Sequence, residues 1–156
     1  MTPAARTPYQ DTSVPVERSK EQIRVALKKA GARGVQFDEL WEPEPLCQIR
    51  FLWPLGEDDD AFTAIRKVRM VVKPLPPERS SRGSAWSVSP EQRERQVWRG
   101  VAWYLDAMLK AATFNLLKAE DIFLSFFEDD TGTTVGEYMR PMLETSGQLL
   151  LPKKTP

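Results

Sequence analysis

The chain has no histidine and only one cysteine among its 156 residues. Without histidine, catalytic triads that use imidazole and His-ligated metal sites are excluded. The single Cys47 can form neither an internal disulfide nor a Cys-rich zinc site, a usage typical of a reducing compartment. A glycine-rich phosphate-binding loop is missing as well. These absences disfavour an enzyme, and we expect no catalytic residue, no metal and no cofactor.

Long apolar runs are also missing. No run approaches the roughly 18 residues that a membrane helix needs, and the N-terminus lacks the apolar segment of a signal peptide. We therefore expect a soluble, cytoplasmic protein with no membrane partner. Its length and its 41% content of hydrophobic residues suffice for one domain with its own core.

The first half of the chain predicts one helix and three strands. Residues 1–16 hold three prolines and few apolar side chains, which predicts a flexible arm lying over the domain or a partner. Ser19 and Gln22 have the spacing of a capping box, so we expect a short helix that ends near Gly31. Apolar alternation then predicts an antiparallel meander of three strands at residues 35–41, 47–55 and 65–75.

The second half predicts helices. Ser89, Pro90 and Gln92 combine an N-cap, a proline at the first helical position and a capping-box glutamine, so a long helix should run to about Asn115. A shorter helix is expected at 116–127, and Thr134 with Glu137 predicts a capping box for a final helix.

The expected fold is therefore α+β, with an N-terminal helix, a three-stranded antiparallel sheet, and a long helix and two shorter helices packed on one sheet face. We expect one domain at 17–145, which includes a long Pro/Ser/Arg-rich loop at 74–89, and a tail at 146–156.

The net charge of zero conceals a segregation of charge. Between residues 66 and 99, nine cations face three anions, whereas the rest of the chain has 13 Lys/Arg against 19 Asp/Glu. A basic patch of this kind attracts polyanions, and a tryptophan in the same stretch could stack on an unpaired base. The candidate nucleic-acid-binding residues are Arg66, Lys67, Arg69, Lys73, Arg79, Arg82, Trp86, Arg93, Arg95 and Arg99.

Two other interpretations of this stretch stay open. The cations could simply solvate an exposed strand edge. However, cations at a helix start oppose its dipole at a cost of roughly 0.3–1 kcal/mol each, which favours a binding role. The order helix, three strands, helix is also that of the double-stranded-RNA-binding domain, with Arg93 and Arg95 at a comparable place. The lysine-rich helix start of that domain is missing here, and the extra C-terminal helices are foreign to it.

Tryptophans and acidic clusters supply the remaining candidates. Trp98 and Trp103 fall off the main apolar stripe of the long helix, and they are the candidate partner-binding residues. Residues 58–60 and 128–130 are consecutive acids that could hold magnesium in a nuclease. Consecutive acids in a turn point in different directions, so solvated turns are the preferred interpretation.

Several short stretches resemble a group of uncharacterised bacteriophage and prophage proteins. The matching stretches are 12–23 (TSVPVERSKEQI), 49–51 (IRF) before Pro54 and Leu55, 95–99 (RQVWR), 116–124 (LLKAEDIFL) and 134–137 (TVGE). The resemblance implies a mobile-element origin, and hence the cytoplasm of a bacterial host, but no assigned activity and no functional residue.

From these patterns we expect a small, non-enzymatic accessory protein that binds nucleic acid, or a nucleic-acid–protein complex, through its basic patch. The alternative is a protein-binding inhibitor or modulator of a host enzyme or defence complex. A magnesium-dependent nuclease ranks below both. The choices between DNA and RNA, single and double strand, and monomer and homo-oligomer stay open.

Overall fold

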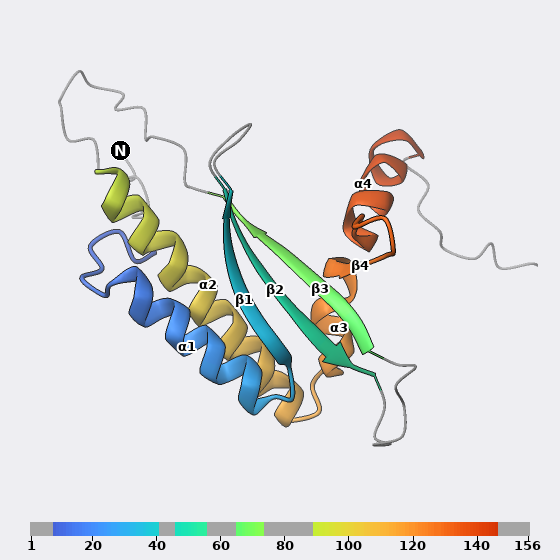
Figure 1. The fold of residues 1–156 in the computed structure, drawn as a ribbon, viewed down its shortest axis with the longest axis horizontal. Helices are drawn as coiled ribbons and strands as arrows, with labels where there is room; N and C mark the ends of the chain where they lie inside the picture. Colours follow the sequence, from blue (N-terminus) through green and yellow to red (C-terminus); the bar gives the residue numbers. More distant parts are fainter. Residues whose placement is uncertain (1–7, 41–45, 56–64, 74–88, 147–156) are drawn as a thin grey trace, which may run out of the picture.

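The computed structural model of this protein, drawn in Figure 1, describes residues 8–40, 46–55, 65–73 and 89–146. The predicted α+β class is confirmed. The elements follow in the order α1 (Val16–Lys29), β1 (Arg33–Leu40), β2 (Leu46–Pro54), β3 (Ile65–Val72), α2 (Pro90–Thr113), α3 (Ala119–Phe123), the 3-10 helix η1 (Leu124–Phe126), β4 (Phe127–Glu128) and α4 (Val135–Ser146).

The sheet is antiparallel and has four strands in the order β1-β2-β3-β4, so the prediction of three strands missed one. β4 has only two residues, and Lys67 and Val68 of β3 pair with Glu128 and Phe127. β4 overlaps the end of the helix predicted at 116–127, because Phe127 belongs to both. The structure instead has the short helix α3 and the single turn η1 there. A strand this short has no alternation of its own to reveal it.

The core lies between one face of the sheet and the helices α1 and α2. These two helices lie side by side and run in the same direction (Figure 1). Alternate residues of the central strands point into the core, because successive side chains of a strand face opposite sides. Phe123 of α3 closes the core, with its ring centroid 5.1 Å from that of Phe51 and 4.9 Å from that of Trp53. The buried apolar side chains of the helices and central strands include Ile23, Leu27, Ile49, Phe51, Trp53, Val68, Met70, Val72, Trp98 and Leu105.

Local capping signals fix two of the helix starts. The Ser89 hydroxyl accepts a hydrogen bond from the backbone N–H of Gln92 at 3.2 Å, which begins α2 as predicted. The predicted capping box of α4 is confirmed, since Glu137 Oε2 accepts from the Thr134 N–H at 2.7 Å and Thr134 Oγ1 accepts from the Glu137 N–H at 3.3 Å. The predicted capping box at Ser19 is wrong.

Helix α1 starts one turn before Ser19. Its N-cap is Pro15, and its first residue, Val16, packs against the core. Burial of this apolar side chain favours the earlier start and leaves Ser19 fully buried inside the helix. Among the residues that the structure describes, the Ser19 hydroxyl has no hydrogen-bond partner.

The described part of the N-terminal arm, residues 8–15, is held against α2. Gln92 Nε2 donates to the backbone oxygens of Gln10 at 3.0 Å and Thr12 at 2.8 Å. The buried Gln96 donates from Nε2 to the backbone oxygen of Pro8 at 2.8 Å. The arm therefore lies over the domain itself. Ser89 caps α2 as predicted, whereas the side chain of Gln92, predicted as its capping-box partner, bonds to the arm instead.

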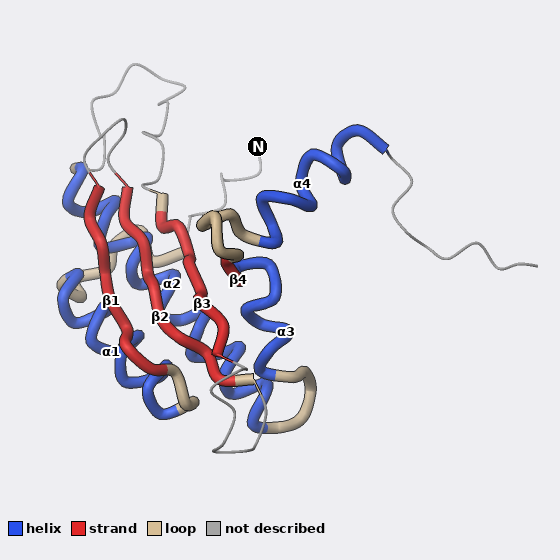
Figure 2. The backbone as a smooth tube through the Cα atoms, turned by 45° about the vertical axis from the view of Figure 1, so that its right-hand side comes forward, coloured by secondary structure: helices blue, strands red, loops and turns tan. Residues whose placement is uncertain are grey.

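Helix α4 extends away from the sheet in Figure 2 and packs against η1 near its own start. A Cβ atom placed on Gly136 would lie 2.9 Å from the backbone oxygen of Ser125. Further along α4, Tyr138, Met142 and Leu143 are exposed. The close approach of the Gly136 backbone to Ser125 therefore positions the helix.

We expect Gly136→Ala to lower the free energy of unfolding by about 1–2 kcal/mol, because the added methyl group overlaps a backbone atom that cannot rotate away. The matched control is Gly100→Ala in the middle of α2, where the added Cβ meets no atom of another element within 4 Å in the described part of the chain. That change should raise stability by about 0.5–1 kcal/mol, since alanine is the better helix former. Urea denaturation of both variants measures the difference, and equal effects would contradict the close contact.

Candidate functional site

The structure does not bring the predicted basic residues together on one face. Lys67 and Arg69 of β3 pair across the sheet with Leu52 and Arg50, whose side chains alternate with the core-facing ones. Helix α2, which contains Arg93, Arg95 and Arg99, packs on the core side of the sheet. Arg66 and Lys73 are exposed at the two ends of β3. The remaining candidates, Arg79, Arg82 and Trp86, lie outside the described residues.

Arg69 forms a network within the protein. Its Nε donates to Glu128 Oε1 at 2.8 Å, and its Nη2 donates to Glu137 Oε2 at 2.7 Å and to the backbone oxygen of Gly132 at 2.9 Å. The side chains of Arg69 and Glu128 are only 14% and 3% exposed. Arg50 Nη2 also lies 3.6 Å from Glu128 Oε2. Arg69 therefore connects β3 with β4 and α4, and its guanidinium is occupied by these partners.

The two candidate partner-binding tryptophans differ sharply. Trp98 is 1% exposed and packs edge-on against Phe37, with ring centroids 5.7 Å apart. The ammonium of Lys20 lies 5.1 Å from the Trp98 ring. Because α2 packs against both the sheet and α1, its buried surface is wider than a single stripe and includes Trp98. The predicted partner-binding role of Trp98 is therefore wrong, whereas Trp103 is 61% exposed.

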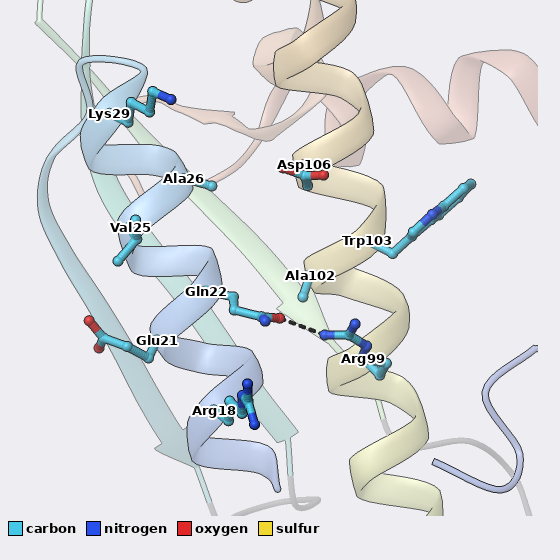
Figure 3. A pocket seen from close by; sticks show the side chains of 10 residues that line it. All are labelled: Arg18, Glu21, Gln22, Val25, Ala26, Lys29, Arg99, Ala102, Trp103 and Asp106. Carbon is cyan, nitrogen blue, oxygen red and sulfur yellow. Dashed lines mark hydrogen bonds between the residues drawn. The ribbon is translucent and has the colours of Figure 1, made fainter. Parts of the chain in front are cut away.

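Trp103 borders a groove between α1 and α2. Figure 3 shows the groove with the strands behind both helices, so it opens on the side away from the sheet. Its volume is about 600 Å³. Ala26 and Ala102 face each other across it, and Arg99 Nη1 crosses it to donate to Gln22 Oε1 at 2.5 Å. The groove is lined by Arg18, Glu21, Gln22, Val25, Ala26, Lys29, Arg99, Ala102, Trp103 and Asp106.

Cations dominate the charge of this groove. Its two acids are already paired with cations that do not line it, Glu21 with Arg24, and Asp106 Oδ2 with Lys110 Nζ at 2.6 Å. The three lining cations are different: Arg99 bonds to a neutral amide, and Arg18 and Lys29 form no ion pair with any residue that the structure describes.

The two helices that form the groove are also positively charged as a whole. The two helices together contain nine Lys/Arg against five Asp/Glu, a surplus of four. The sequence interpretation missed α1, because its cations lie some 70 residues away from those of α2. Arg18 and the pair Lys28 and Lys29 were the available signal.

The acidic turn before α4 is structural. Asp129 Oδ1 accepts hydrogen bonds from the backbone N–H groups of Thr131 at 2.8 Å and Thr133 at 3.0 Å, and Oδ2 accepts from the Tyr138 hydroxyl at 2.9 Å. The hydroxyl of Thr131 also donates to Oδ1, and these bonds lower the Asp129 pKa to about 2. Residues 58–60, the other acidic cluster, lie outside the described part of the chain. Within that part, no three carboxylates or thiols are grouped as metal ligands.

Acid should weaken this turn. The pKa of Asp129 is about 2, and the N–H of Thr134 lowers the pKa of Glu137 below its ordinary value. Because both folded values lie below the unfolded ones, the stabilisation is complete above about pH 5 and is lost as pH falls toward 2. Denaturant titrations from pH 6 to pH 2 should show this loss. Asp129→Asn, which cannot ionise, should lose less unfolding free energy than the wild type between pH 4 and pH 2. If the variant and the wild type lost the same amount over this range, the carboxylate of Asp129 would not be the group responsible.

No protein-family model matches the chain, and no curated protein or solved structure matches it either. None of the helices in the described ranges has the length and apolar content that crossing a lipid bilayer requires. The groove and its charges are the features of the molecule that bear on its function.

Proposed function

We propose that this protein is a non-enzymatic nucleic-acid-binding protein whose contact surface is the α1–α2 groove. The observation that supports it is the meeting of cations from two helices, Arg18, Lys29 and Arg99, in a groove whose acids are paired elsewhere. Unpaired cations aligned on one surface attract a phosphate backbone and release its condensed counterions. Compared with the expectation from sequence, the function is kept. Its proposed location moves from a patch formed by β3, residues 74–89 and the first turns of α2 to the groove between α1 and α2, and Arg99 belongs to both.

The spacing of the groove cations suits a chain of phosphates. Arg18 and Lys29 lie eleven residues apart on α1, which corresponds to about 16 Å along a helix. That length spans several phosphates of one strand, since neighbouring phosphates rise by about 3.4 Å along a duplex strand. Arg95, which is exposed and lies one turn before Arg99, extends the same surface toward the start of α2.

A salt titration tests the proposal. The affinity for fluorescein-labelled 20-nucleotide DNA and RNA, measured by fluorescence anisotropy between 50 and 300 mM NaCl, should fall linearly on logarithmic axes. The combined variant Arg18→Gln, Lys29→Gln and Arg99→Gln removes three phosphate contacts. It should reduce the slope for a single strand by about 2, because each contact contributes about 0.7.

The matched control removes the same charge elsewhere. Arg33→Gln, Arg66→Gln and Lys67→Gln change three exposed cations of β1 and β3 that do not line the groove. This variant should keep the wild-type slope. If the control variant lost slope and the groove variant did not, the binding surface would lie on the sheet. If the wild-type protein bound no oligonucleotide at 50 mM salt, the proposed function would be rejected.

A further inference from the structure

Trp103 combines exposure with a position beside cations. A single exposed apolar side chain is ordinary on a protein surface and needs no explanation. Trp103, however, borders the groove that Arg99 and Lys29 also line, and its indole extends from α2 on the side away from α1 (Figure 3). A flat aromatic side chain beside a cationic track is the arrangement by which proteins hold unpaired bases, because every base has a face that can stack.

The groove is too narrow for a duplex to enter. Packed helices have axes about 8–10 Å apart, and Ala26 and Ala102 face each other between α1 and α2. A duplex is much wider than this separation, so its phosphates could reach only the rim. Its bases are also stacked on one another, so none is free to lie on Trp103. A single strand can place its backbone along the cations and turn one base onto the indole.

We infer that the nucleic acid bound by this protein is single-stranded, with one base stacked on Trp103 and the flanking phosphates held by Arg99 and by Arg18 or Lys29. This inference depends on the proposed function, because it names the form of nucleic acid that the same groove binds. Arg99 is held in place for this task by its hydrogen bond to the neutral Gln22, which leaves its charge available.

The test separates the contribution of the bases to binding from that of the phosphate backbone. The probes are labelled dT12, labelled rU12, an abasic 12-mer that keeps the phosphates, and a 20-base-pair duplex, all at 50 mM NaCl. Trp103→Ala should weaken binding of dT12 and rU12 by roughly 5- to 150-fold, the effect of losing one stacked base. Trp103→Phe should recover part of that affinity, because it restores an aromatic face. Binding of the abasic strand should be unchanged in both variants.

A matched control is Phe114→Ala, which removes another exposed aromatic side chain, at the C-terminal end of α2 and outside the groove lining. It should leave dT12 binding unchanged, and thermal unfolding should show that all variants are folded. Equal weakening of dT12 and the abasic strand by Trp103→Ala, or a duplex bound as tightly as dT12, would overturn the single-strand inference. In either case the salt-dependent groove, and with it the proposed function, would stand.

Discussion

Replacing Trp98 with alanine should lower the free energy of unfolding by about 3–5 kcal/mol, the usual cost of removing a large buried aromatic side chain. Trp98 is 1% exposed and packs edge-on against Phe37. The variant also leaves the buried ammonium of Lys20 without the indole face beside it, although the ion pairs of Lys20 with Glu17 and Glu39 remain. Urea denaturation monitored by far-UV circular dichroism measures the loss.

Trp103→Ala is the control for this experiment, because it removes the same side chain from the same helix at a 61% exposed position. Its effect on stability should stay within about 0.5 kcal/mol. The two variants should therefore differ in kind: Trp98→Ala should lower stability, whereas Trp103→Ala should weaken nucleic-acid binding and leave stability nearly unchanged. Similar losses of stability in both would contradict the burial of Trp98.

Replacing Arg69 with methionine should destabilise the protein by about 3 kcal/mol or more. The change keeps much of the side-chain volume. Among the described residues, it leaves the carboxylate of Glu128, which is 3% exposed, with the longer 3.6 Å contact to Arg50 as its one remaining ion pair. Removing one partner of a buried ion pair costs about 3–5 kcal/mol, because the other charge stays buried. Glu137, at 44% exposed, can turn to solvent and should contribute less.

Two comparisons make this prediction specific. Lys67→Met changes an exposed cation of the same strand and should alter stability by no more than about 0.5 kcal/mol. The double variant Arg69→Met with Glu128→Gln should recover part of the loss, since it removes the unpaired charge. If Arg69→Met were as stable as Lys67→Met, the guanidinium would be free for an external ligand after all.

Local signals predicted much of the fold. Ser89 and Pro90 mark the start of α2, and apolar alternation marks β2 and β3, because these patterns depend on neighbours within one turn or one strand. The start of α1 was misplaced, since the position of Val16 is decided by its contact with the core. β4 was missed for the same reason: this two-residue strand depends on its pairing with β3, some 60 residues earlier in the chain.

The candidate site was harder to predict than the fold, because it depends on contacts between residues that lie far apart in the sequence. A cluster of cations in the sequence says nothing about which partners neutralise them, and the partners of Arg69 lie 59 and 68 residues away. Trp98 and Trp103 were equivalent in the sequence because both lie off the main stripe of α2. The packing of α1 against α2 separates them, and it also creates the groove from residues of both helices.

The shared direction of α1 and α2 has an electrostatic consequence for the groove. Each helix has a dipole equivalent to about half a positive charge at its start and half a negative charge at its end. Because the two helices run in parallel, both positive ends lie toward Arg18 and both negative ends lie toward Lys29 (Figures 1 and 3). Along α1 the side-chain charges have the opposite order, with Glu17 in the first turn and Lys28 and Lys29 in the last. The dipoles therefore make the potential along the groove more even, so that an anion is attracted at the Arg18 end as well as at the Lys29 end.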